Sequence, residues 1–117
     1  MRLPVLPAVL TSGVVFLATS APAFAAGTQF WNLTANTIVN FSLAPAGTDH
    51  FGKNQCENDH DASVDHDERL KITGVESGSY DARLVDSKGR TCVVKALAIK
   101  SGKVFSIEEG ELKSCTP

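Results

Sequence analysis

The sequence predicts an all-β fold, a small antiparallel sandwich or barrel, and three observations support this prediction. Short segments rich in β-branched and aromatic residues recur along the chain. Most of these segments alternate apolar and polar side chains with a period of two, and turn residues separate them at short intervals. The rest of the chain has no convincing amphipathic helix, so helices are not expected to contribute to the core.

The expected strands are short and follow one another closely. They are residues 29–34, 37–43, 69–73, 80–85, 91–99 and 104–107. The link Ala35-Asn36 has the two-residue length of a hairpin turn, so the first two strands are expected to pair. Residues 86–89 end in glycine and predict a type I turn. Ser101-Gly102 is expected to join the last two strands in the same way as the first link.

Alternation along these strands also predicts the core. The expected inward residues are Val39, Phe41, Leu70, Ile72, Tyr80, Leu84, Phe105 and Ile107. Residues 91–99 are apolar on both faces, which is typical of a central strand. Gly78-x-Tyr80 at the start of a strand resembles the tyrosine position of immunoglobulin-like sandwiches. We therefore expect a sandwich or barrel, immunoglobulin-like in its finer detail.

The N-terminus predicts export. Arg2 supplies a small positive charge, an apolar stretch follows, and Ala23-x-Ala25 has the small side chains that precede a cleavage site. We expect a signal peptide over residues 1–25 and a single β domain over residues 26–117, located in the periplasm or outside the cell. No long apolar run follows the first 26 residues, so no membrane span is expected in the mature chain.

Charge and motif content narrow the function classes. The chain has 11 basic and 13 acidic side chains and lacks the basic patch that nucleic acid binding requires. It also lacks a nucleophile elbow and a phosphate-binding glycine loop. We therefore expect a protein that is not an enzyme, with no catalytic residue. Phe30 and Trp31 are expected to pack in the core, and Asp81 and Arg83 to form an exposed ion pair.

Three cysteines remain after the predicted cleavage and would meet an oxidising compartment. We expect a Cys92–Cys115 disulfide. A hairpin at Ser101-Gly102 would place Cys92 opposite Glu111, four residues from Cys115, so a small fold-back would bring the two sulfurs together. The other two pairings remain open at this point. Cys56 would then be a free thiol or an intermolecular one.

The densest group of chemistry-bearing residues is an acidic loop at about residues 49–68. Six of the 13 acidic residues lie within residues 57–68, with no Lys or Arg among them. Alternating oxygen ligands can surround a hard cation such as Ca²⁺, although the EF-hand pattern fails at Val64 and Leu70. The candidate Ca²⁺ ligands are Asp59, Asp61, Asp65 and Asp67. His60 and His66 would instead suit Zn²⁺ or Cu²⁺, and the third alternative is a solvated loop that only aids solubility.

Several motifs resemble a family of small exported bacterial β-proteins. They are Asn32-x-Thr34, Ile38, Leu43-x-Pro45-Ala46-Gly47-Thr48, Phe51-Gly52 and Tyr80-Asp81-x-Arg83-x-Val85-Asp86-x-x-Gly89. The resemblance covers most of the mature chain and implies export and a β fold. It implies no catalytic residue, because the family has no established activity or cofactor. Phe51 stands where the family usually has Trp, and the acidic insert after Asn54 is longer.

Two function classes follow. The first is an exported, non-catalytic β domain, an interaction or envelope-associated module with an unknown protein or envelope partner and no cofactor. The alternative is a divalent-metal-binding module that uses the acidic segment from Asp59 to Glu68, with Ca²⁺ favoured over Zn²⁺ and Cu²⁺.

Overall fold

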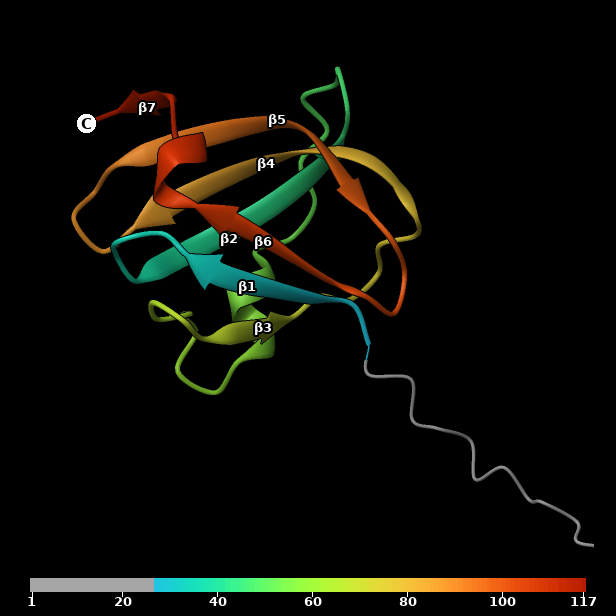
Figure 1. Cartoon of the computed structure of the whole chain (residues 1–117), viewed down its shortest axis with the longest axis horizontal. Coiled ribbons are helices and arrows are strands. Elements are labelled where there is room, and N and C mark those ends of the chain that lie inside the picture. Colours follow the sequence, from blue (N-terminus) through green and yellow to red (C-terminus); the bar gives the residue numbers. More distant parts are fainter. Residues whose placement is uncertain (1–26) are drawn as a thin grey trace, which may run out of the picture.

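The computed structural model describes residues 27–117 as a β-sandwich (Figure 1), which confirms the predicted fold class. One sheet has the order β3–β1–β6, formed by β1 (Gln29–Leu33), β3 (Arg69–Lys71) and β6 (Val104–Glu108). The other has the order β2–β4–β5–β7, formed by β2 (Ile38–Pro45), β4 (Gly78–Asp86), β5 (Thr91–Ile99) and β7 (Ser114–Thr116). Two short 3-10 helices are η1 (Gln55–Asn58) and η2 (Glu109–Glu111). The predicted signal peptide lies outside the described residues.

The predicted hairpin between the first two strands is wrong, because β1 and β2 belong to different sheets. The Asn32 side chain accepts hydrogen bonds from the Thr34 N–H (3.0 Å) and hydroxyl (2.6 Å) and donates to the Asn36 carbonyl (3.0 Å). These bonds fold the link into a local turn that carries the chain from one layer to the other. β1 pairs instead with β3 in antiparallel and β6 in parallel orientation.

The last predicted hairpin is wrong for a similar reason. The turn at Ser101-Gly102 forms, and the Lys103 N–H donates to the Lys100 carbonyl (3.1 Å). However, the Gln29 N–H donates to the Lys103 carbonyl and directs β6 to β1 in the other sheet. β7 then returns to β5, where Cys92 faces Cys115 directly in the ladder. The predicted Cys92–Cys115 disulfide is confirmed, although the expected position of Cys92 opposite Glu111 is not.

The core lies between the two sheets. The rings of Phe30 and Phe41 stack across the layers with centroids 4.2 Å apart, and the Phe105 ring lies 5.6 Å from Phe30. Of the predicted core, Phe41, Leu70, Ile72, Leu84 and Ile107 are buried, and Tyr80 and Phe105 pack against it with partial exposure. Val39 was predicted wrongly, because it is 39% exposed.

A bulge in β2 explains the exposure of Val39. The register with β4 shifts between Ile38 and Asn40, so Ile38 turns into the core and Val39 turns out. The Asn54 side chain supports this distortion, since its oxygen accepts from the Phe41 N–H (3.0 Å) and its amide donates to the Val39 carbonyl (3.3 Å). A period-two pattern cannot reveal such an extra residue.

Tyr80 makes the backbone contact that defines a tyrosine corner. Its hydroxyl donates to the Glu76 carbonyl at 2.7 Å, four residues upstream. The Tyr80 ring lies over the backbone of Gly78, where a Cβ would be 3.4 Å from it, in ordinary van der Waals contact. The immunoglobulin-like detail of the fold stays a prediction beyond this contact.

Candidate functional site

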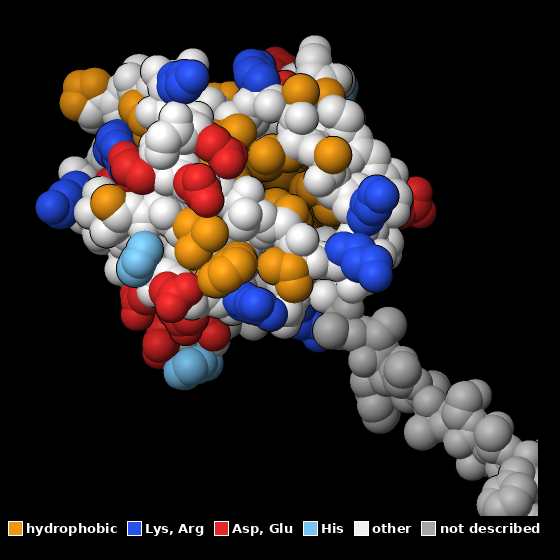
Figure 2. All heavy atoms as spheres, viewed as in Figure 1, with side chains coloured by type: hydrophobic (Ala, Val, Ile, Leu, Met, Phe, Trp, Pro, Cys, Tyr) orange, Lys and Arg blue, Asp and Glu red, His pale blue; other side chains and the backbone are white. Residues whose placement is uncertain are grey.

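The acidic residues 57–68 form one surface of the domain. In Figure 2 the Asp and Glu side chains gather at the lower left, with His side chains at the borders of the group. Their backbone is held firmly at one point, since Val64 and Ile38 exchange two hydrogen bonds of 2.9 Å. The buried Asn32 amide also donates to the Val64 carbonyl at 3.0 Å. Residues 64–68 are therefore attached to both sheets.

Two predicted metal ligands already accept hydrogen bonds from the protein. Asp65 accepts from the Thr37 hydroxyl at 2.8 Å, and Asp67 accepts from the Trp31 indole N–H at 3.0 Å. His66 is also engaged, because its Nδ1 lies 2.7 Å from the Thr34 carbonyl oxygen and must donate to it. These three side chains hold residues 65–67 against β1 and the β1–β2 link.

The structure brings three other predicted ligands together. His60 Nδ1 lies 3.4 Å from an Asp59 oxygen, and His60 Nε2 lies 3.2 Å from an Asp61 oxygen. One ligand atom from each residue lies within 4.8 Å of the others. The second Asp59 oxygen, Oδ2, is buried and has no hydrogen-bond partner. Two carboxylates and one imidazole in this arrangement can supply three ligands to a divalent cation.

The outer face of the three-stranded sheet carries the features that sequence reasoning missed. Trp31 and Leu33 point outward from β1 with partial exposure, while Phe30 and Asn32 point into the core. Val104 of β6 is 42% exposed on the same face, beside Gln29. Figure 2 shows hydrophobic side chains next to one another across the front, over β1, with basic side chains below them.

The placement of Trp31 corrects the expectation of core packing. Because neighbouring residues in a strand point to opposite faces, Phe30 and Trp31 cannot both enter the core. The Arg69 guanidinium lies 5.0 Å from the Trp31 ring centroid, and Lys71 follows two positions along β3 on the same face. We call Trp31, Leu33, Val104, Arg69 and Lys71 the outer sheet face. Strand alternation in the sequence was the signal that could have found it.

The predicted exposed ion pair between Asp81 and Arg83 is also wrong. Asp81 is buried, and its carboxylate accepts from the N–H groups of Ala96 and Gly47, both at 3.0 Å, and from Lys95 at 3.3 Å. The hydrogen bonds from the Ala96 and Gly47 backbone are the main reason that the pKa of Asp81 lies below its ordinary value. Arg83 lies over the Phe51 ring instead, 4.5 Å from its centroid.

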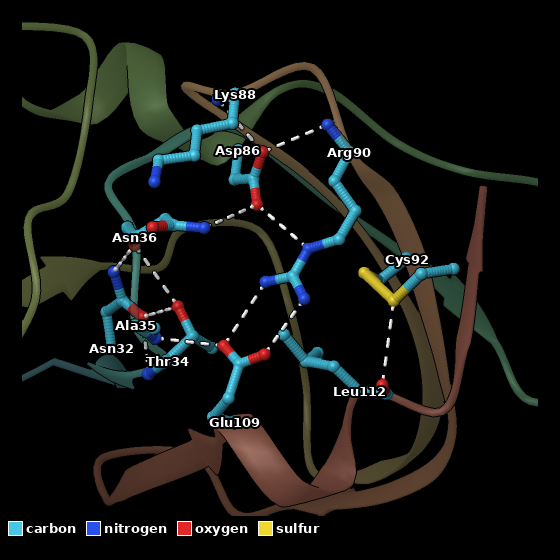
Figure 3. Close-up of polar contacts among 11 residues, drawn as sticks. Asn32, Thr34, Ala35, Asn36, Asp86, Lys88, Arg90, Cys92, Glu109 and Leu112 are labelled. Carbon is cyan, nitrogen blue, oxygen red and sulfur yellow. Dashed lines mark hydrogen bonds and ion pairs between the residues drawn. A yellow bond between two sulfur atoms is a disulfide. The ribbon is translucent and has the colours of Figure 1, made fainter. Parts of the chain in front are cut away.

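A polar network joins the two sheets at the end of the domain that holds the disulfide (Figure 3). Arg90 donates to Asp86 at 3.0 Å and to both oxygens of Glu109 at 2.8 and 3.2 Å. Burial would raise the pKa of Asp86, but hydrogen bonds from Asn36 and from Arg90 outweigh it and lower that pKa. The hydrogen bond from Arg90 likewise lowers the pKa of Glu109. Every charged group here has a protein partner, so the network is structural.

Cys56 is a free and fully buried thiol. Its sulfur donates weakly to the Ile38 carbonyl at 3.6 Å. Burial, and then the neighbouring charge of Asp59, raise the pKa of Cys56 to about 11. Because the thiolate is the reactive form, Cys56 is unreactive in the folded domain and cannot reach a second chain.

A pocket of about 620 Å³ lies between the loops that follow β2 and β3. Its apolar lining comes from Leu43, Pro45, Val75 and Tyr80, and polar residues from both loops complete it. His50, Lys53 and Glu76 are its ionisable residues, and a lining with side chains of both charges indicates no particular ligand.

No family model, no curated protein and no solved structure matches the chain. The resemblance to small exported bacterial β-proteins stays a prediction. Within residues 27–117, no helix has the length and apolar character needed to cross a membrane.

Proposed function

We propose that this chain is an exported, non-catalytic interaction domain that binds a protein partner through its outer sheet face. The observation that supports this most directly is Trp31, which points away from a core that is complete without it. The Asp67 hydrogen bond and the Arg69 guanidinium hold the indole in one orientation. A fixed aromatic side chain loses little entropy on binding, and Trp and Arg are the residues most enriched in binding hot spots.

The charge pattern of this face indicates the chemistry of the partner's surface. Arg69 and Lys71 lie on β3 beside the apolar residues, and Glu108 on β6 is the acidic residue of the opposite edge. A complementary surface would place apolar side chains against Trp31 and Val104 and acidic side chains against β3. The partner is therefore a protein with an apolar patch bordered by Asp or Glu.

A pair of variants tests this function. Cross-linking in the native envelope would identify the partner, and its affinity would then be measured with purified proteins. Trp31→Ala should weaken binding by at least about tenfold, the loss of a modest hot spot. Val39→Ala is the control, since Val39 is an apolar residue, 39% exposed, that lies on the other sheet. Equal binding by both variants, or binding only to anionic lipid vesicles, would contradict a protein partner on this face.

A second candidate function is divalent metal binding by Asp59, His60 and Asp61. The buried, unpartnered Oδ2 of Asp59 favours it, because a buried carboxylate oxygen without a donor is costly and a cation would satisfy it. Calorimetric titration with Ca²⁺, Zn²⁺ and Cu²⁺ tests this candidate. Saturable heat should disappear in Asp59→Asn and persist in Asp49→Asn, a control in which an exposed Asp beside His50 is changed. Absence of saturable heat with all three ions would exclude it.

A further inference from the structure

The C-terminal residues 109–117 form a closing segment across one side of the sandwich. Figure 1 shows the chain leaving β6, passing through η2 and returning as β7 beside β5. Besides the ladder between β5 and β7, several side-chain contacts hold the segment: Glu109 contacts Arg90 and the Ala35 N–H, Leu112 packs partly buried against the core, and Cys115 is bonded to Cys92. Only the last of these contacts is covalent.

Apart from its disulfide, β7 makes few contacts with the rest of the domain. It pairs with three residues of β5, and the side chains of Ser114 and Thr116 are exposed. Cys115 is its one half-buried residue. No residue of the closing segment belongs to the fully buried core, so its release withdraws only the partly buried side chains of Leu112 and Cys115 from the sandwich.

The strands inside the loop closed by the disulfide have partners of their own. β5 pairs with β4 along most of its length, from Thr91 to Ile99, and β6 pairs in parallel with all five residues of β1. These ladders do not depend on β7. Breaking the disulfide therefore removes a constraint from residues 112–117 while leaving both sheets paired.

We propose that the Cys92–Cys115 disulfide is a redox latch: a dithiol reductant opens it and releases residues 112–117 from β5, while the rest of the sandwich stays folded. Release uncovers the edge of β5 at Thr91–Val93, which β7 otherwise pairs. An unpaired edge is a template for another extended chain, so the latch couples thiol chemistry to exposure of a binding edge.

The chemistry follows from the different exposure of the two sulfur-bearing residues. A reductant thiolate attacks Cys115, because Cys92 is buried and only 2% exposed. The Cys92–Cys115 bond breaks, a mixed disulfide forms on Cys115, and Cys92 leaves as a thiolate that takes up a proton. The second thiol of the reductant, as its thiolate, then displaces Cys115. The products are two cysteine thiols and the oxidised disulfide of the reductant, with two electrons transferred.

Cys56 provides an internal test of how far the domain opens. The mature chain is treated with dithiothreitol and pulsed with a thiol-alkylating reagent. Local opening should label Cys92 and Cys115 and leave the buried Cys56 unlabelled. Labelling of all three cysteines at the same rate would show global unfolding and overturn the latch.

Hydrogen exchange gives the second readout. On reduction, amide exchange in residues 114–116 should accelerate by about 100-fold, while exchange in β1 and β4 changes by less than about twofold. Unchanged protection of β7 would also overturn the proposal. A double variant, Cys92→Ala with Cys115→Ala, should show the same open pattern without reductant. Arg90→Gln, which weakens the neighbouring contact to Glu109, should make the intact disulfide reduce faster.

Discussion

The two halves of the acidic segment have similar sequences and different structural roles. In residues 64–68, Asp65 and Asp67 accept hydrogen bonds from side chains of the sandwich. In residues 59–61, the Asp59 and Asp61 carboxylates face a histidine between them, and one Asp59 oxygen has no donor at all. The difference shows that a carboxylate becomes structural where the fold supplies a donor, and stays available for a ligand where it does not.

The substitution with the largest expected effect removes Asn32, the residue that holds residues 64–68 in place. Asn32→Ala deletes a buried amide that makes four hydrogen bonds, including the one to Val64. We expect a loss of about 3 kcal/mol in unfolding free energy, because several buried groups lose their partners. Urea denaturation measures it. Asn40→Ala is the control, since the Asn40 oxygen accepts one bond from Ser42, and it should cost less than about 1 kcal/mol.

Substitution of single aspartates should show that the two halves of the segment contribute differently to stability. Asp67→Ala removes the acceptor of the Trp31 indole and should cost about 1 kcal/mol in unfolding free energy. Asp61→Ala should leave stability within about 0.5 kcal/mol of wild type, because Asp61 is exposed and surface pairs contribute little. Thermal melting without divalent ions measures both, and equal losses would remove the distinction.

The polar network of Figure 3 predicts that the stability of the domain depends on pH. The pKa values of Asp86 and Glu109 are lowered in the folded state, so the folded domain holds fewer protons there than the unfolded chain. The resulting stability is fully present above the ordinary carboxyl pKa of about 4 and is lost as the pH falls through the lowered values.

Arg90→Gln should make this loss of stability with falling pH shallower, because it removes a cause of both shifts. Lys88→Gln is its control, since Lys88 contacts Asp86 only through its backbone N–H. Urea denaturation between pH 6 and pH 2.5 measures the slope, and identical slopes in both variants would contradict the assigned cause.

The smallest expected effect is on the alkylation rate of Cys56. Its thiol lies behind the Asp59 half of the segment, and its pKa is raised to about 11 by burial and then by Asp59. Alkylation at pH 8.5 should therefore proceed only at the rate at which the domain opens. Asp59→Asn should lower the pKa of Cys56 without speeding its alkylation, because burial is the larger cause. Rapid labelling of the folded wild type would contradict this.

Strand alternation predicted most of the strands and most of the core, because burial on one face requires a period of two. It failed at Val39, where the bulge adds a residue. At Trp31 alternation was right, since it places Trp31 outside once Phe30 is inside, and the error was to expect both aromatic residues in the core. Strand partners could not be predicted, since a two-residue link such as Ala35-Asn36 serves a crossing between sheets as well as a hairpin.

The candidate site was predictable only in composition. The sequence identified the acidic segment, but its spacing treated Asp59, Asp61, Asp65 and Asp67 as equivalent. The different roles of these aspartates depend on hydrogen-bond donors far away in the chain, such as Trp31 and Thr37. Such contacts follow from the pairing of β1 with β3, which no local pattern specifies.

The parallel pairing of β1 with β6 has a consequence for the order in which the chain can fold. Phe30 of β1 lies beside Phe105 of β6, so β1 cannot complete its pairing until β6, the second-last strand, is present. During synthesis from the N-terminus, Phe41 of β2 and the strand β3 follow β1 early, but the edge of β1 that pairs with β6 stays unpaired until residues 104–108 have been made. Contacts this distant in sequence slow folding. The domain therefore completes its sandwich only after nearly the whole chain has emerged, and a chaperone that shields β1 until then would raise the yield of folded protein.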